Sequence, residues 1–136
     1  MYNNSQWTDA RFHSFIKGGL RQISSRWPPK HDVKKAARLS RGIYLCAGYE
    51  VPAHKVVASL PPLPGNKRRI NNAQVDHIIP VIEKCFTNWD DVIKHMFCEA
   101  KDLQVLCNDC HKRKTKDERI ERERINKRWK EVLKIQ

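Results

Sequence analysis

The sequence predicts a small α+β protein that is mostly helical, and three patterns lead to this prediction. Apolar residues recur at helical spacing in residues 9–25 and again, among many charges, in residues 109–133. Between these two stretches, Leu103–Leu106 alternates in the way a β-strand does. Because only 40% of the 136 residues are hydrophobic and 31% are charged, the core must be small, and a bound metal would help to stabilise it.

The N-terminal region should form two helices. Thr8 is a suitable N-cap for a first helix over residues 9–25, which Trp27 and the two prolines after it should end. A second helix is expected over residues 32–39, before Gly42. Basic side chains cluster on or just after this second helix, and they could either contact phosphates or form an ordinary solvated face.

The middle of the chain should supply short strands and loops. Ile43–Cys46 is typical of a short strand or turn, and the proline-rich stretch 59–66 should be a loop without regular structure. Val75 should lie in a strand that delivers Asp76 and His77. Neighbouring strand residues face opposite ways, so both can reach one site only if the backbone departs from regular pleating. Residues expected in the core are Ile78, Ile79, Val81 and Ile82 and, in a helix that Thr87 or Asn88 begins, Trp89, Val92, Ile93 and Met96.

The net charge of +12 is distributed unevenly along the chain. Residues 1–41 carry 9 Lys and Arg against 2 Asp and Glu, and residues 112–136 carry 11 against 5. The part between them is close to neutral, with 7 against 8. Two basic arms around a neutral centre suit a protein that binds nucleic acid, although basic charge can also serve solubility alone.

Cysteine usage and the N-terminus bear on the compartment. No run of about 18 apolar residues is present, so no membrane span is expected. Residues 1–6 lack the basic and apolar regions of a secretion signal. We therefore expect a cytoplasmic protein whose five cysteines serve as metal ligands or buried thiols rather than as disulfides.

Two short motifs carry most of the chemical information. The first places Asp76 and His77 next to each other, shortly before Pro80. The second is a C-x-x-C pair, Cys107 and Cys110, with His111 directly after it. An acid with an imidazole suits a hard divalent cation and an attacking water, whereas paired thiols suit zinc. Together they suggest metal-assisted phosphodiester cleavage beside a separate structural metal.

The D-H-I-x-P element at residues 76–80 and the L-Q-x-L-C-x-x-C-H-x-x-K-T element at residues 103–115 resemble the HNH nuclease family, and segments 86–93 and 96–99 resemble its bacteriophage branch. The resemblance spans residues 46–116 and implies a ββα-metal core within residues 42–116, flanked by a basic helical arm (1–41) and a basic helical extension (117–136). It also implies a DNA endonuclease, in the host cytoplasm if phage-encoded. By this resemblance His77 is the general base, and Asp76 and His111 hold one catalytic Mg²⁺ or Mn²⁺. Asp102 stands where the family motif has Asn, and Asp cannot donate the hydrogen bonds of that Asn.

A structural zinc is the second expectation from the resemblance, which places a first C-x-x-C pair near Cys46. Here Tyr49 stands where the second cysteine would be, and a phenol is a poor zinc ligand beside a thiolate. A turn between Tyr49 and Ala53 could return His54 to Cys46. We therefore expect a zinc site of Cys46, His54, Cys107 and Cys110; otherwise His54 is a surface imidazole and the cysteines are small buried hydrophobes.

DNA is the expected partner, and the sequence indicates no oligomeric state. The residues expected to contact its phosphates are Lys67, Arg68, Arg69, Lys112, Arg113, Lys114, Lys34, Lys35 and Arg38, and each of these three groups could instead be solvated surface charge. Two alternatives stay open: a non-catalytic zinc-bearing DNA-binding module on a nuclease scaffold, which Tyr49 and Asp102 favour, and an RNA-directed protein. Intact Asp76, His77 and His111 favour the nuclease, because binding alone needs none of them.

Overall fold

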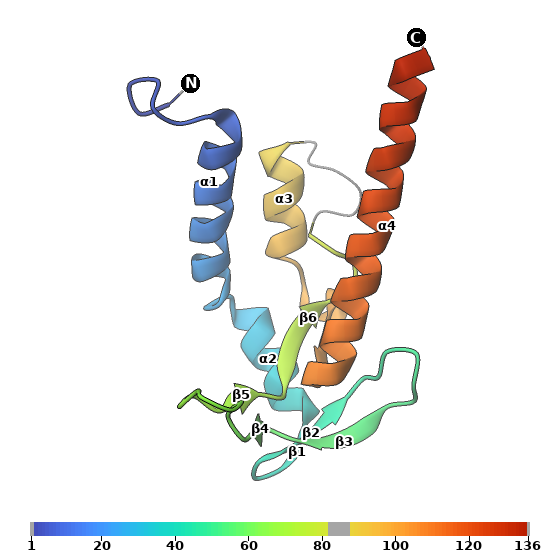
Figure 1. Cartoon of the computed structure of the whole chain (residues 1–136). Helices are drawn as coiled ribbons and strands as arrows, with labels where there is room; N and C mark the ends of the chain where they lie inside the picture. Colours follow the sequence, from blue (N-terminus) through green and yellow to red (C-terminus); the bar gives the residue numbers. More distant parts are fainter. Residues whose placement is uncertain (1, 82–87, 136) are drawn as a thin grey trace.

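Two helices open the chain in the computed structural model, which describes residues 2–81 and 88–135 (Figure 1). Helix α1 (Asp9–Ser24) confirms the first prediction, and the side chain of Thr8 accepts from the backbone N–H of Arg11. Helix α2 (Pro28–Ala37) begins earlier than predicted, because proline at the first helical position loses no hydrogen bond there.

The predicted end of the second helix at residue 39 is wrong. Arg38–Ser40 form strand β1, which turns at Gly42 (φ 75°) into β2 (Ile43–Cys46). Strand β2 then pairs with β3 (His54–Val57), so that the three strands form an antiparallel sheet in the order β1-β2-β3. The expected strand at Ile43–Cys46 is thereby confirmed.

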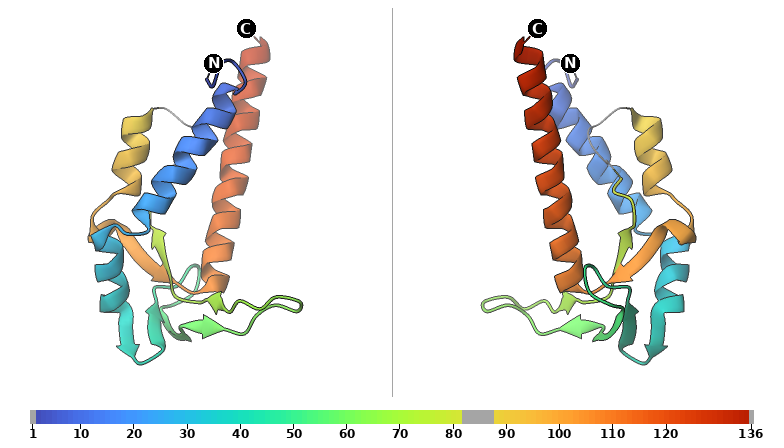
Figure 2. Two further views of the ribbon diagram at one scale, coloured as in Figure 1. Left: turned by 90° about the vertical axis from the view of Figure 1, so that its left-hand side faces the viewer. Right: turned by 90° about the vertical axis from the view of Figure 1, so that its right-hand side faces the viewer.

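The next segment, residues 59–71, forms an arm. Strand β4 (Ser59–Leu60) pairs with β5 (Ile70–Asn71), and the proline-rich chain between them is irregular. The prediction that all of 59–66 lacks regular structure is therefore wrong for its first two residues, which precede the prolines and keep their N–H groups. Figure 2 shows the arm extending away from the rest of the chain, on the side where α4 lies.

A second hairpin lies at the centre of the fold. Strand β6 (Gln74–His77) pairs antiparallel with β7 (Leu103–Leu106), and α4 (Asn108–Ile135) follows β7 directly, close to the predicted 109–133. Helix α2 contacts both strands, and so does α4. Figure 2 shows these two helices on opposite sides of the hairpin.

The segment between β6 and β7 contains α3 (Trp89–Met96) and the short helix η1 (Ala100–Asp102). Asn88 caps α3 by accepting from the backbone N–H of Asp91, and Val92 and Met96 are buried as predicted. Trp89 is half-buried, its ring packs edge-on against that of His13 in α1, and Ile93 is exposed. Ile82, Cys85 and Thr87 lie outside the described residues.

Placing Ile78 and Ile79 in the core is wrong, because they are 45% and 51% exposed. Strand β6 ends at His77 and the chain bends at these two residues, so they lie beyond the hairpin rather than beneath it. Val81 is half-buried. The buried residues that do form a cluster are Cys46, Leu106, Cys107 and Cys110, with Tyr49 and Val56 packed against them. The core is thus small, as the composition predicts, and three of the four residues in this buried cluster are cysteines.

The long helices extend beyond this core. In Figures 1 and 2, α1, α3 and α4 rise from the strands toward the end of the molecule where both termini lie. Several apolar residues of α4 are exposed, namely Ile120, Trp129, Val132 and Leu133. Within the described residues, no helix has both the length and the apolar character that a membrane crossing requires.

Candidate functional site

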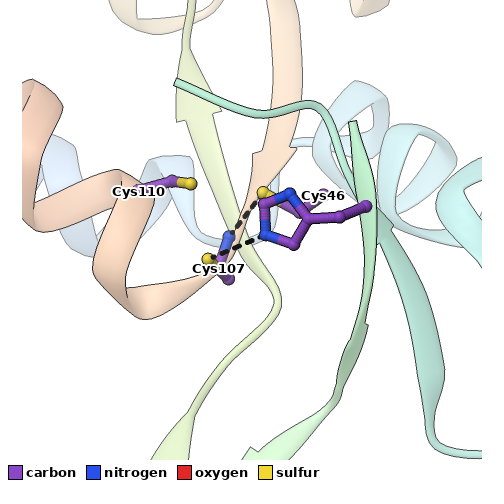
Figure 3. Close-up of side chains that lie close together, drawn as sticks. Cys46, Cys107 and Cys110 are labelled. Carbon is purple, nitrogen blue, oxygen red and sulfur yellow. Dashed lines mark hydrogen bonds between the residues drawn. The ribbon is translucent and has the colours of Figure 1, made fainter. Parts of the chain in front are cut away.

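Three cysteines and one histidine from distant parts of the sequence meet in the buried cluster. The ligand atoms of Cys46, His54, Cys107 and Cys110 all lie within 4.8 Å of one another. Figure 3 shows the three thiols turned toward a common centre, where a dashed line joins Cys107 Sγ to an imidazole nitrogen, the 3.6 Å contact to His54 Nε2. The structure therefore brings together the four side chains that the sequence predicts as one metal site.

Local structure explains why His54 joins the cysteines. Cys46 ends β2 and His54 begins β3, and the two are directly paired across the sheet. The turn between them requires Gly48 (φ 84°), because a Cβ there would collide with the carbonyl oxygen of Val51. The expected return of the chain after Tyr49 is confirmed.

Backbone N–H groups point at the sulfurs. Cys46 Sγ accepts from the N–H groups of Gly48 at 3.3 Å and Cys107 at 3.2 Å. Arg113 Nη2 donates to Cys110 Sγ at 3.3 Å. Hydrogen bonds of this kind favour the thiolate over the thiol, and the thiolate is the form that binds a metal.

Burial raises the pKa of these thiols, whereas hydrogen bonds from backbone N–H groups lower it. Burial raises the pKa of Cys46 to about 11. Burial also opposes ionisation of Cys107, but hydrogen bonds from the backbone N–H of Cys110 and from neighbouring groups outweigh it, so the pKa of Cys107 lies below its ordinary value. A position at the N-terminus of a helix, or in a C-x-x-C pair, commonly lowers the pKa of a thiol in this way.

The spacing of these four ligand atoms can be compared with the spacing around a tetrahedral zinc ion. Zinc binds sulfur at about 2.3 Å and imidazole nitrogen at about 2.0 Å, so tetrahedral ligands lie roughly 3.5–3.8 Å apart. The contact of 3.6 Å between Cys107 Sγ and His54 Nε2 fits that spacing. A Cys₃His cluster of this size could bind a metal such as zinc.

Tyr49 has a different role from the cysteine it stands in for. Its hydroxyl donates to Asp117 Oδ2 at 2.7 Å, which ties the turn after β2 to α4. The hydrogen bond to Asp117 raises the pKa of Tyr49 to about 12, with smaller contributions from burial and nearby acids. Tyr49 is therefore no thiolate substitute, and it connects the same two elements that a metal ligand there would connect.

A second pair of potential ligands meets on the face of the hairpin that α4 covers. His111 Nε2, in the first turns of α4, lies 3.6 Å from Asp76 Oδ1 on β6. The carboxylate is 11% exposed and the imidazole 34% exposed, so the pair is reachable from solvent through His111. The sequence predicts that these two side chains share one ion, and the structure brings their nearest ligand atoms to 3.6 Å from each other.

Lys114 corrects one of the predicted DNA contacts. It is 8% exposed, and its ammonium contacts Asp76 Oδ2 at 2.9 Å and Glu118 Oε1 at 2.6 Å and donates to the backbone oxygen of His77 at 2.7 Å. Burial opposes the charge, but the hydrogen bonds to Glu118 and Asp76 outweigh burial and raise the pKa of Lys114. Because its ammonium is buried and already paired with two carboxylates and a backbone carbonyl, this lysine is not available to contact DNA.

Two residues of this network were not predicted from the sequence. Gln104 Nε2 donates to Asp76 Oδ2 at 3.1 Å, and Gln104 and Asp76 are directly opposed across β6 and β7. Glu118 follows Lys114 by one helical turn. Both relations have a sequence signal, the cross-strand pairing of alternating positions and the i,i+4 spacing on a helix.

His77 lies on the other face of the strand. The register of β6 against β7 is regular from Gln74 to His77, so the predicted departure from pleating is absent, and the two neighbours point opposite ways. His77 Nε2 lies 2.9 Å from the carbonyl oxygen of Met96 at the end of α3. A carbonyl only accepts, so Nε2 carries the proton and Nδ1 of the neutral ring is left as the basic nitrogen.

Asp102 acts through its backbone. Its carbonyl oxygen accepts from the N–H of Ile78 at 3.0 Å, which extends the β6–β7 pairing by one bond. Within the described part of the chain its side chain makes no hydrogen bond, so the side-chain ties that the family motif assigns to Asn are not reproduced here. The loop is closed instead by the backbone bond.

The other predicted DNA contacts fall on two sides of the molecule. Lys67 and Arg68 are exposed in the arm, where Arg69 donates to Ser59. Lys34 and Lys35 belong to α2, across the hairpin from α4 (Figure 2), and the Lys34 ammonium lies 5.8 Å from the Tyr44 ring centre. Exposed Arg38 donates to the Ser40 carbonyl in β1. Only the arm and α4 therefore lie on the same side as Asp76 and His111.

Comparisons with family models, with curated proteins and with solved structures find no match to this chain. The site geometry and the sequence motifs therefore have to support any function by themselves.

Proposed function

We propose that this chain is a metal-dependent DNA endonuclease of the HNH type. The observation that supports it most is the contact between Asp76 Oδ1 and His111 Nε2 at 3.6 Å, because it joins the two motifs of the sequence at one point. A carboxylate and an imidazole that meet in this way are a pair of side chains that can hold a divalent cation for metal-assisted hydrolysis.

The Asp76–His111 pair could hold a small divalent cation if its two side chains came slightly closer together. Mg²⁺ binds in octahedral geometry at about 2.1 Å, so two adjacent ligands lie about 3.0 Å apart. Asp76 Oδ1 and His111 Nε2 lie 3.6 Å apart, and binding would draw them together. When bound, Mg²⁺ or Mn²⁺ would neutralise charge on the scissile phosphate and on the departing 3′ oxygen. Two protein ligands leave the remaining positions for water and substrate.

His77 is the proposed general base. The hydrogen bond to the Met96 carbonyl orients its ring, and the bond from Lys114 to its backbone oxygen fixes its strand, so that Nδ1 is held ready to take a proton from water. A general base contacts the attacking water and not the metal ligands. Asp76 and His77 face opposite sides of a regular strand, so this role requires either a local rearrangement of β6 or a phosphate that reaches round the end of the strand.

The Cys₃His cluster is proposed as a structural zinc site. Four protein ligands close the coordination sphere, as in structural rather than catalytic zinc sites. Cys107 and Cys110 flank the first turn of α4, directly before His111. Zinc bound there would fix the start of α4 and so aim the His111 ring at Asp76.

The DNA backbone has a basic path next to the proposed cation. His111, Lys112, Thr115, Lys116 and Arg119 line one hollow on α4, and the three cations among them are exposed. The ion pair of Arg119 with Glu123, at 3.9 Å, joins two largely exposed side chains and leaves the guanidinium available to phosphate.

We expect the double substitution Lys116→Gln with Arg119→Gln to weaken DNA binding and to lower the slope of log affinity against log salt by about 2, or about 1 per phosphate contact. The measurement is fluorescence anisotropy of a labelled duplex over a salt series. The matched control, Lys127→Gln with Lys130→Gln, removes the same charge farther along α4 and should lose less. A larger loss in the distal pair, or a flat salt response of the parent protein, would exclude this path.

Two observations favour a second candidate function, a zinc-bearing DNA-binding module without catalysis. The ammonium of Lys114 already pairs with Asp76, and His77 faces away from that carboxylate. A nicking assay separates the two functions: supercoiled DNA and a structured RNA are incubated in parallel with the zinc-loaded protein, with and without added Mg²⁺ or Mn²⁺. Nicking of DNA only when the cation is added supports the nuclease, whereas binding without cleavage supports the module.

A further inference from the structure

Lys114 occupies a position that the proposed chemistry does not use. It is buried between β6 and α4, where its ammonium forms ion pairs with Asp76 Oδ2 and Glu118 Oε1 and donates a hydrogen bond to the backbone oxygen of His77. An ammonium held by two carboxylates and a carbonyl is fixed in place, so it can in turn fix what it touches.

We propose that Lys114 and Gln104 are positioning residues, which hold Oδ2 of Asp76 so that Oδ1 alone is presented, with His111, to a divalent cation. The inference rests on the proposed function, because it concerns the same cation site. It assigns the orientation of the metal-binding carboxylate to two side chains that do not themselves touch the metal.

The geometry of the carboxylate supports this division between its two oxygens. Oδ2 is paired with the Lys114 ammonium at 2.9 Å and accepts a hydrogen bond from Gln104 Nε2 at 3.1 Å. Oδ1 has His111 Nε2 as its neighbour at 3.6 Å, which is longer than a hydrogen bond and would shorten around a bound ion. Free rotation of the carboxylate would exchange the two oxygens, and the two donors prevent it.

Glu118 makes the arrangement compatible with a cation. Asp76 and Glu118 carry two negative charges against the one positive charge of Lys114, so the buried network is negative by one charge. Without Glu118 the network would be neutral and would attract a divalent cation less. The same ammonium also holds the backbone of His77, so it couples the metal ligand to the strand that carries the proposed base.

Charge and position predict opposite effects when Lys114 is replaced. If the lysine only added positive charge, Lys114→Met would bind a cation more tightly, because a repulsive charge is gone. If it positions the carboxylate, the same substitution binds the cation less tightly. Gln104→Met removes a donor without changing charge, so any loss of affinity there reports positioning alone.

The test is titration of Mn²⁺ into zinc-loaded full-length protein by calorimetry. Gln104→Met and Lys114→Met are each expected to weaken Mn²⁺ binding by about 10–100-fold, as loss of outer contacts to a metal ligand commonly does. Lys127→Met is the matched control, since it removes the same charge from an exposed position farther along α4 and should not weaken binding. Unchanged or tighter binding in Gln104→Met overturns the proposal, and this variant decides the matter if Lys114→Met does not fold.

A second measurement, made without Mn²⁺, separates this inference from the proposed function. Denaturant unfolding of Lys114→Met, Asp76→Asn and the double variant should show a coupling of about tenfold in the folding equilibrium constant. Additive effects overturn the contact itself. If the coupling is present but the parent protein binds no Mn²⁺, both the proposed nuclease and the positioning role are overturned. If Gln104→Met and Lys114→Met bind Mn²⁺ as tightly as the parent protein does, the positioning role alone is overturned.

Discussion

His77→Ala is expected to slow metal-dependent cleavage of plasmid DNA by about 10²–10⁴-fold, the usual contribution of a general base. DNA and Mn²⁺ affinity should stay near those of the parent protein, because His77 contacts the Met96 carbonyl and neither Asp76 nor His111. The measurement is the initial rate of supercoiled-plasmid nicking in Mg²⁺ or Mn²⁺, with affinity measured separately.

Two further variants separate the base from its structural contact. His77→Gln can still donate to the Met96 carbonyl but offers no basic nitrogen, so it should be as slow as His77→Ala while folding normally. His31→Ala removes an exposed imidazole from α2 and should cleave at the parent rate. Full activity in His77→Gln would remove His77 from the catalytic role.

Loss of zinc is expected to unfold the protein at 25 °C. Structural zinc contributes about 10–16 kcal/mol in zinc-finger peptides, comparable with the whole stability of about 5–15 kcal/mol of a typical domain. Here the four ligands join β2, β3 and the start of α4, and three of them belong to the buried cluster itself. Chelation of the parent protein and the variant Cys107→Ser should both abolish the cooperative thermal transition seen by circular dichroism.

Native mass spectrometry should find one zinc per parent chain and none in Cys107→Ser. His54→Ala should lose affinity but keep the three thiols, so zinc should become easier to remove with a weak chelator. Cys98→Ser is the matched control: this half-buried thiol lies outside the cluster, so zinc and the transition should remain. A parent protein that carries no zinc, or that keeps its transition after chelation, would contradict a structural zinc.

The parts of the fold that depend on local pattern could be predicted from the sequence. The cap at Thr8, the periodic helix after it and the cap at Asn88 are properties of a few adjacent residues. The return of His54 to Cys46 could be predicted because a short turn leaves the chain little choice. Trp27 and the prolines after it do end the first helix, but Pro28 also begins the second helix earlier than predicted, because proline is common at a first helical position.

The burial of Lys114 could not be predicted from the local sequence pattern. Its neighbours on α4 are basic and exposed, and nothing in the local pattern distinguishes it from them. Its burial follows from the docking of α4 on β6, which brings Asp76 and the backbone of His77 to its ammonium. The facing of Asp76 and His77 depends likewise on the register with β7, a relation between distant segments.

The most direct test of the account is a crystal structure of the zinc-loaded protein soaked in Mn²⁺, with anomalous scattering recorded at the manganese edge. We expect one manganese peak between Asp76 Oδ1 and His111 Nε2, apart from the zinc among the three cysteines and His54. The contradicting result is a well-ordered Asp76–His111 pair that has no manganese and in which Lys114 still pairs with the Asp76 carboxylate. The protein would then be a basic nucleic-acid binder rather than a nuclease.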